Sequence, residues 1–142
     1  MKNDGDPFYE FYDRIRKTRE NQFGLISGGQ MRNFAYGYQL GAVAYLCTIA
    51  PFRPDIANQF YNLLVQKRYD DAWQMVFRYE EQWLRVAIEV DWLGAIKSAL
   101  LLHGLYPNNR PSPPMPEGTP ESVEKVRQVL ERTFGTIIRA AL

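Results

Sequence analysis

The sequence predicts an α/β fold near its N-terminus followed by helices, so the chain is α/β by origin but mostly helical in content. Two short apolar runs, 23–27 and 42–48, alternate with segments of helical spacing. From residue 55 onward, apolar residues recur at helical spacing only. Strands that alternate with helices over short turns are typical of parallel strands joined by right-handed crossovers.

The first helix is predicted over 7–20. Asp6 is a typical N-cap residue, and Pro7 suits the first helical position. The apolar run after this helix is too short to be helical and stops at Gly28-Gly29, which predicts a buried strand of about five residues.

A short helix is predicted over 30–39 and a second strand over 42–48. This second run is continuously apolar rather than alternating, as expected of a strand that is covered on both faces in a parallel sheet. Two such strands do not form a stable sheet alone. We therefore expect further strands beside them.

The remainder of the chain predicts helices over 55–67, from Asp70 onward and over 92–103. Gly104 fits the left-handed backbone conformation that often ends a helix, here the third of these helices. The segment 107–116 contains five prolines and is predicted to be an extended connector.

A final helix is predicted to begin after that connector. Thr119 fits the N-cap position, Pro120 the first helical position, and Glu121 the first turn, where an acidic residue is favourable.

Composition excludes some classes of partner. The chain has 17 basic and 16 acidic residues among 142. The resulting net charge of +1 produces no electrostatic field strong enough to indicate nucleic acid or an anionic membrane as a partner. No apolar stretch reaches the length of a membrane span, and the N-terminus lacks an apolar signal core, so a cytoplasmic protein is expected. Cys47 stands alone in an apolar run and is expected to be a small buried core residue.

Few residues suggest chemistry by themselves. Gly28-Gly29 is compatible with tight packing at a strand end, with a substrate that approaches the backbone, or with a phosphate, although the P-loop and dinucleotide spacings are missing. Lys2 alone indicates a solvated terminal lysine. His103 is expected to cap a helix rather than to act in catalysis. The acidic pairs 70–71 and 80–81 are expected on solvated helix faces.

Four segments taken together resemble a known family. They are "LISGGQ" at 25–30, "GAVAYLCTIAPFRPDIANQFYNLL" at 41–64, "KRYDDAW" at 67–73 and "AIKSALLLHGLYPNNRPSPPMP" at 95–116. Their order is similar to the C-terminal part of the dihydrodipicolinate synthase / N-acetylneuraminate lyase family. The resemblance covers nearly the whole chain.

This resemblance implies a (β/α)8 TIM barrel with a C-terminal helical extension, often assembled as a homo-oligomer. Residues 22–28 correspond to the seventh strand, 42–48 to the eighth strand and 55–67 to the eighth barrel helix. The implied division is a partial barrel over 1–67, with about two to three of the eight strands, and a helical extension over 68–142.

The resemblance also implies site residues. Members form a Schiff base through a lysine at the end of the sixth strand, shortly before a Gly-Asp pair, and Lys2 before Gly5-Asp6 matches that lysine. Gly28 corresponds to a glycine that lines the pocket. Tyr45 falls where the eighth strand usually places an aliphatic residue beside the keto acid. The implied substrate is a 2-keto acid such as pyruvate, with no metal and no cofactor.

The family's proton-relay tyrosine and the turn that holds the substrate carboxylate would lie before residue 1, and Asp91-Trp92 replaces a common Asn-Pro. We therefore expect a fragment of an aldolase or lyase that is inactive as this isolated chain, and whose open strand edges favour self-association. The alternative is a non-catalytic interaction module that uses the helices of 68–142 for oligomerisation.

Overall fold

The computed structural model describes residues 2–3, 8–28 and 30–137, with side chains from residue 12 onward within those ranges. The chain divides into two compact units. Unit 1 comprises Met1–Ala50 and Pro54–Val76, and unit 2 comprises Pro51–Arg53 and Phe77–Leu142. The division at 67 and 68 implied by the family resemblance stays a prediction.

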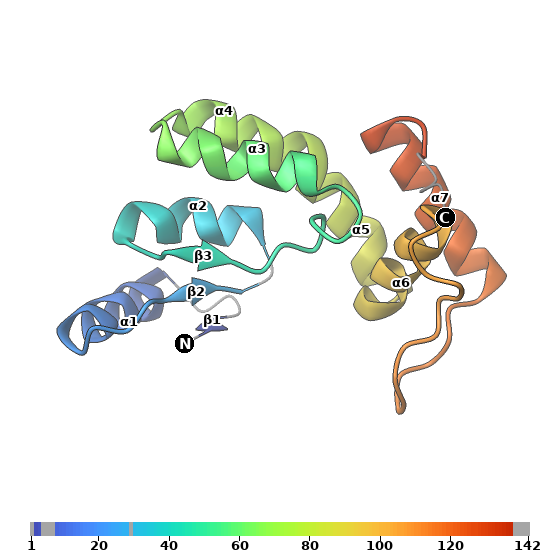
Figure 1. The fold of residues 1–142 in the computed structure, drawn as a ribbon, viewed down its shortest axis with the longest axis horizontal. Coiled ribbons are helices and arrows are strands. Elements are labelled where there is room, and N and C mark those ends of the chain that lie inside the picture. Colours follow the sequence, from blue (N-terminus) through green and yellow to red (C-terminus); the bar gives the residue numbers. More distant parts are fainter. Residues whose placement is uncertain (1, 4–7, 29, 138–142) are drawn as a thin grey trace. The chain divides into compact units, whose positions relative to one another are not determined.

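Unit 1 contains a parallel sheet of three two-residue strands in chain order (Figure 1): β1 (Lys2–Asn3), β2 (Ile26–Ser27) and β3 (Ala44–Tyr45). β2 and β3 lie inside the two apolar runs, so both predicted strands and their parallel direction are confirmed. The hydrogen-bonded ladder is shorter than the apolar runs.

Within the described residues, four helices belong to unit 1: α1 (Phe8–Glu20), α2 (Met31–Leu40), α3 (Pro54–Val65) and α4 (Tyr69–Met75). α2 contacts β2, β3 and the other three helices. It ends at Gly41, whose φ of 108° lies in the left-handed region that suits glycine. The Arg19 guanidinium occupies the space that a Cβ at Gly41 would need, so this glycine also permits a close contact between α1 and the end of α2.

Aromatic side chains form the centre of unit 1. Phe34 is fully buried and stacks on Tyr45 with ring centroids 4.6 Å apart, and on Tyr61 with centroids 5.9 Å apart. Phe60 meets the Tyr45 ring edge-on at 5.7 Å. Because these rings come from α2, α3 and β3, their packing fixes both helices against one face of the sheet.

The long helix predicted from Asp70 changes its winding in the middle. α4 is followed by a π-helical segment, η1 (Val76–Glu80), and then by α5 (Glu81–Val90). A π-turn holds an extra residue compared with an α-turn, so it changes the helix face on which the later side chains lie. Glu80 at the end of η1 is only 1% exposed, and the prediction of a solvated face there is wrong for this residue.

The described part of unit 2 contains the helices α5, α6 (Trp92–Leu102) and α7 (Pro120–Phe134), which contact one another. Phe52 is its aromatic centre: its ring lies 5.0 Å from that of Trp83, 5.8 Å from that of His103 and 5.6 Å from that of Phe134. Trp83 belongs to α5, His103 is the C-cap of α6 and Phe134 is the last residue of α7. The contacts of Phe52 therefore join the segment 51–53 to all three helices.

The predicted start of α7 and the predicted end signal after α6 are confirmed. The Thr119 side chain accepts a hydrogen bond from the Ser122 amide at 3.1 Å, with Pro120 as the first residue of α7. Gly104 follows α6 with a φ of 72°. The proline-rich connector contains no helix or strand, and a turn is closed by the Met115 amide, which donates to the Ser112 carbonyl at 3.2 Å.

Candidate functional site

The register of the three strands determines which residues share a face of the sheet. Lys2 pairs with Ile26, which pairs with Ala44. The next row contains Ser27 and Tyr45. Since side chains alternate between the two faces along a strand, these two rows belong to opposite faces.

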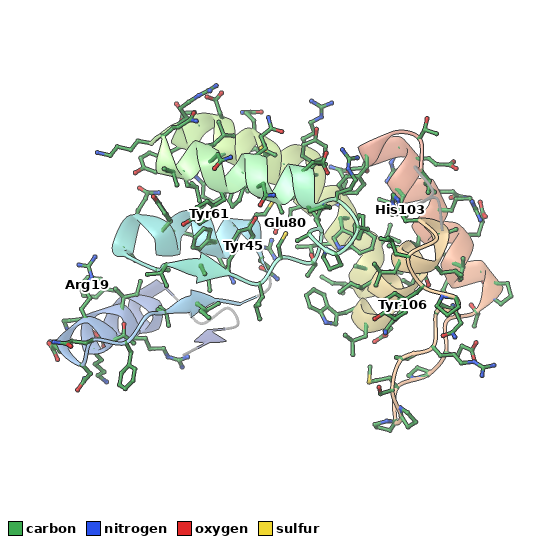
Figure 2. All side chains as sticks on the ribbon, viewed as in Figure 1. Arg19, Tyr45, Tyr61, Glu80, His103 and Tyr106 are labelled. Atoms are coloured by element: carbon green, nitrogen blue, oxygen red, sulfur yellow. The ribbon has the colours of Figure 1, made fainter. Side chains whose placement is uncertain are left out.

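Helices cover the face that carries Ser27 and Tyr45. Ser27 is fully buried. The Tyr45 hydroxyl donates a hydrogen bond to the Ala57 carbonyl of α3 at 3.0 Å. Figure 2 shows Tyr45 and Tyr61 close together between β3 and α3. The Tyr45 side chain is therefore part of the helix-packed layer and lies on the face opposite to Ile26.

The face that carries Ile26 is more open. Ile26 is 37% exposed, and Leu46, two residues after Ala44 and so on the same face, is 51% exposed. The Leu46 amide donates to the Ser27 carbonyl at 3.0 Å, which continues the ladder by one residue and places Leu46 beside Gly28. Gly28 is buried. This end of the strands is their carboxyl end, where barrel enzymes bind substrates.

The predicted site residues thus occupy different positions. Lys2 belongs to β1, and Gly28 directly follows the neighbouring strand β2. The Tyr45 side chain packs among helices. Leu46 lies on the same face of the sheet as Ile26, a position that strand alternation counted from Tyr45 identifies.

Two other residues considered in the sequence, His103 and Cys47, have defined positions. His103 is the C-cap residue of α6 and stacks on Phe52, which agrees with the predicted place at a helix end. Cys47 is half-buried rather than fully buried. Within the described ranges, no three His, Cys, Asp or Glu residues gather as a metal site.

A cleft of about 300 Å³ lies between α1 and α2. Its lining includes Tyr12, Arg16, Arg19 and Gln39. It contains none of the predicted site residues. None of the helices in the described part of the chain is long and apolar enough to span a membrane.

Unit 1 contains three parallel strands with helices over one face, and unit 2 contains further helices. Together these elements define the C-terminal part of a (β/α)8 barrel with its helical extension. No protein-family model matches the sequence, and no curated protein does. Solved structures do match, and they include barrel enzymes of the expected type.

The chain is similar to a dihydrodipicolinate synthase from Thermotoga maritima, with a TM-score of 0.81 and 14% identity over 95% of this chain and 45% of that one. It is similar to the N-acetylneuraminate lyase of Proteus mirabilis, with a TM-score of 0.79 and 18% identity over 96% and 45%. It also matches the Fusobacterium nucleatum N-acetylneuraminate lyase complexed with pyruvate, with a TM-score of 0.77 and 14% identity over 93% and 43%.

The chain therefore spans less than half the length of these structures. At such low identity the similarity establishes the fold, and the predicted resemblance to this family is confirmed at that level. The pyruvate is a property of the matched lyase.

Proposed function

We propose that the chain is the C-terminal part of a class I aldolase or lyase barrel that forms a Schiff base with a 2-keto acid such as pyruvate. The parallel register carries this proposal, because it gives Lys2 the position beside Ile26 on the open face of the sheet. Both the family motif and the strand pairing thus favour the same lysine. The similar lyase that binds pyruvate supports the class of substrate.

The chemistry requires a neutral amine. The nitrogen lone pair of Lys2 attacks the keto carbon, and a C–N bond forms. The former keto oxygen takes one proton from the amine and one from the solvent and leaves as water, so that a positively charged iminium remains. The resulting iminium withdraws electrons from the neighbouring carbon, so that a C–C or C–O bond can break or form there. A closed and partly dry barrel favours this step because desolvation lowers the pKa of a lysine.

Gly28 and Leu46 complete the proposed pocket wall. Gly28 lets the substrate approach the backbone at the end of β2. Leu46 supplies the aliphatic side chain that the family places on the eighth strand, since Tyr45 faces the helices. We accordingly propose that Tyr45 shapes the pocket through β3 and not by contact with the keto acid.

The proposed activity belongs to a complete barrel. The chain covers 43% to 45% of the matched enzymes, and its three-stranded sheet is too small to close into a barrel. We therefore expect the isolated 142-residue chain to be inactive. The substrate, its reaction and the assembly of subunits are proposals for the whole barrel.

Borohydride trapping tests the proposal. A complete barrel containing this chain is incubated with pyruvate and treated with borohydride, which reduces the Schiff base to a stable adduct. Its peptides are then analysed by mass spectrometry. We expect the adduct on the peptide that contains Lys2, its loss in Lys2→Arg, and its retention in the control Lys17→Arg. If neither pyruvate nor any other 2-keto acid gives an adduct at Lys2, the proposal is wrong.

A further inference from the structure

The cleft between α1 and α2 lies away from the proposed keto-acid pocket. Its lining comes from α1 and from the last turn of α2. α2 ends at Leu40, a few residues before β3 begins at Ala44, so the cleft adjoins the amino ends of the strands. Gly28 and Leu46 belong to the carboxyl ends. A ligand in this cleft would therefore be separate from the proposed Schiff-base chemistry.

Two arginines of α1 line the cleft. Arg16 and Arg19 are three residues apart and so lie on one face of the helix. The Arg19 guanidinium lies against the backbone of Gly41, just after α2, and Figure 2 shows this side chain directed from α1 toward the end of α2. Among the described residues it forms no ion pair and no side-chain hydrogen bond. Its N–H donors are therefore available to a ligand.

Arg16 has acidic neighbours, but its ion pairs are long. Its guanidinium nitrogens lie 3.9 Å from an Asp13 oxygen and 3.7 Å from a Glu20 oxygen. Charge-assisted hydrogen bonds between such groups are about 2.7–2.9 Å long. The side chains of both pairs are exposed, and exposed ion pairs contribute little to stability. An anionic ligand can therefore replace these contacts at little cost.

Most of the remaining lining is apolar. Ile15 is 3% exposed, Leu40 is half-buried, and the Tyr12 ring lies at the edge of the helix. The Gln39 side-chain amide donates a hydrogen bond to the Ala35 carbonyl at 3.1 Å, so α2 itself holds this group. The volume of about 300 Å³ is at the lower limit for small-molecule sites. The cleft thus suits a small ligand with a short apolar part.

We propose that this cleft binds a small organic anion, whose carboxylate or phosphate group is held by Arg19 and Arg16 and whose apolar part lies on Ile15 and Leu40. Planar guanidinium groups hold two oxygens of such a group in parallel hydrogen bonds. The lining contains two arginines against one acidic residue, Glu20, and this balance favours an anion over a cation. Because Arg19 reaches the end of α2, the bound anion connects both helices.

NMR titration of the 142-residue chain tests the site. The probes are phenylacetate and phenyl phosphate, and phenylacetamide is the neutral control because it keeps the ring without the charge. We expect the anions to shift the amide signals of Gln39 and Gly41 saturably, and phenylacetamide to bind at least about tenfold more weakly. Binding of one anion alone supports the proposal and identifies the group that the arginines prefer.

Variants test the role of the arginines. Arg19→Gln should raise the dissociation constant of the anion at least about tenfold. Arg19→Lys keeps the charge but loses the planar fork, so its affinity should lie between those of wild type and Arg19→Gln. Lys17→Gln is the matched control, because it removes one positive charge from an exposed position in the last turn of α1 outside the cleft lining. It should leave the dissociation constant nearly unchanged, and circular dichroism should show the same helix content in all variants.

Three results would each overturn the proposal. They are the absence of a saturable shift with either anion, equal weakening by Arg19→Gln and Lys17→Gln, and wild-type affinity in Arg19→Lys together with tight binding of phenylacetamide. Equal weakening would indicate general attraction to a basic helix. Borohydride trapping at Lys2 in the complete barrel should be the same in Arg19→Gln as in wild type, so failure of this site and failure of the Schiff-base proposal are distinguishable.

Discussion

The two units differ in how completely their own residues cover their secondary structure. In unit 1, helices cover one face of the β-sheet, while Ile26 and Leu46 on the other face stay 37% and 51% exposed. In unit 2, three helices enclose an aromatic centre at Phe52 and Trp83, while single apolar side chains such as Ile88 of α5 stay exposed. The incomplete unit contains the residues proposed for chemistry, and the more complete unit contains features typical of a structural role.

This difference indicates how each unit can be stabilised. Among the described residues, the outer strands β1 and β3 have no further partner, and a sheet with such edges and an open face depends on more strands for full burial. Three helices that pack around a buried aromatic centre depend less on such an addition. Variants in each unit test this contrast, and the largest change is expected in unit 2.

Truncation of Trp83 should have the largest effect. Its side chain is fully buried against Phe52, and its indole N–H has no hydrogen-bond partner among the described residues. We expect Trp83→Ala to lower the free energy of unfolding of unit 2 by about 3–5 kcal/mol. Hydrogen exchange should show lost protection in α6 and α7 and retained protection in α2.

Two controls accompany this variant. Trp83→Phe keeps a ring and removes a buried donor without a partner, so its cost should be clearly smaller. Ile88→Ala alters a side chain of the same helix that is 68% exposed and should be nearly neutral. Equal loss of protection in α2 and α7 would mean that the two units unfold together, and the contrast between them would fail.

The sequence predicted most of the secondary structure because its signals are local. Thr119 followed by Pro120 indicates a helix start, and Gly104 indicates a helix end, through backbone preferences that act within a few residues. The parallel strands were predicted from apolar runs and short turns. Their pairing places Lys2 beside Ile26, a contact between residues far apart in the chain that only the fold brings about.

Two side-chain orientations could not be predicted in the same way. Glu80 is buried because a π-turn precedes α5, and a constant helical period cannot reveal that shift. For Tyr45, the family resemblance predicts the strand to which the residue belongs, but not the face of the sheet on which its side chain lies. A shift of one residue moves a strand side chain to the opposite face, and for this reason we propose Leu46 rather than Tyr45 for the pocket wall.

A smaller effect is expected from the Tyr45 hydroxyl. Tyr45→Phe removes the hydrogen bond to the Ala57 carbonyl while keeping the ring on Phe34. We expect a loss of about 0.5–1.5 kcal/mol in the free energy of unfolding, measured by urea titration. Tyr12→Phe, at a 47% exposed position, is the control and should change little. Unchanged stability together with altered keto-acid trapping in the complete barrel would place Tyr45 in the pocket instead.

The smallest effect concerns Lys125 in unit 2. Its ammonium lies 2.8 Å from a Glu89 oxygen of α5 and 3.3 Å from a Glu121 oxygen of α7. The hydrogen bond to Glu89, followed by that to Glu121, raises the pKa of Lys125. Since the folded state holds this proton more tightly than the unfolded chain, the contribution is fully present at neutral pH and is lost as alkaline pH passes the raised pKa.

The measurement compares the melting temperatures of wild type and Lys125→Met as pH increases. The wild type should be slightly more stable at neutral pH, and the difference should shrink in the alkaline range. Exposure and salt keep the effect small. Glu89→Gln removes the main cause of the pKa shift and should reduce the alkaline change. A difference that grows with alkaline pH would contradict the assignment, because a proton bound more tightly in the folded state can only lose stabilisation there.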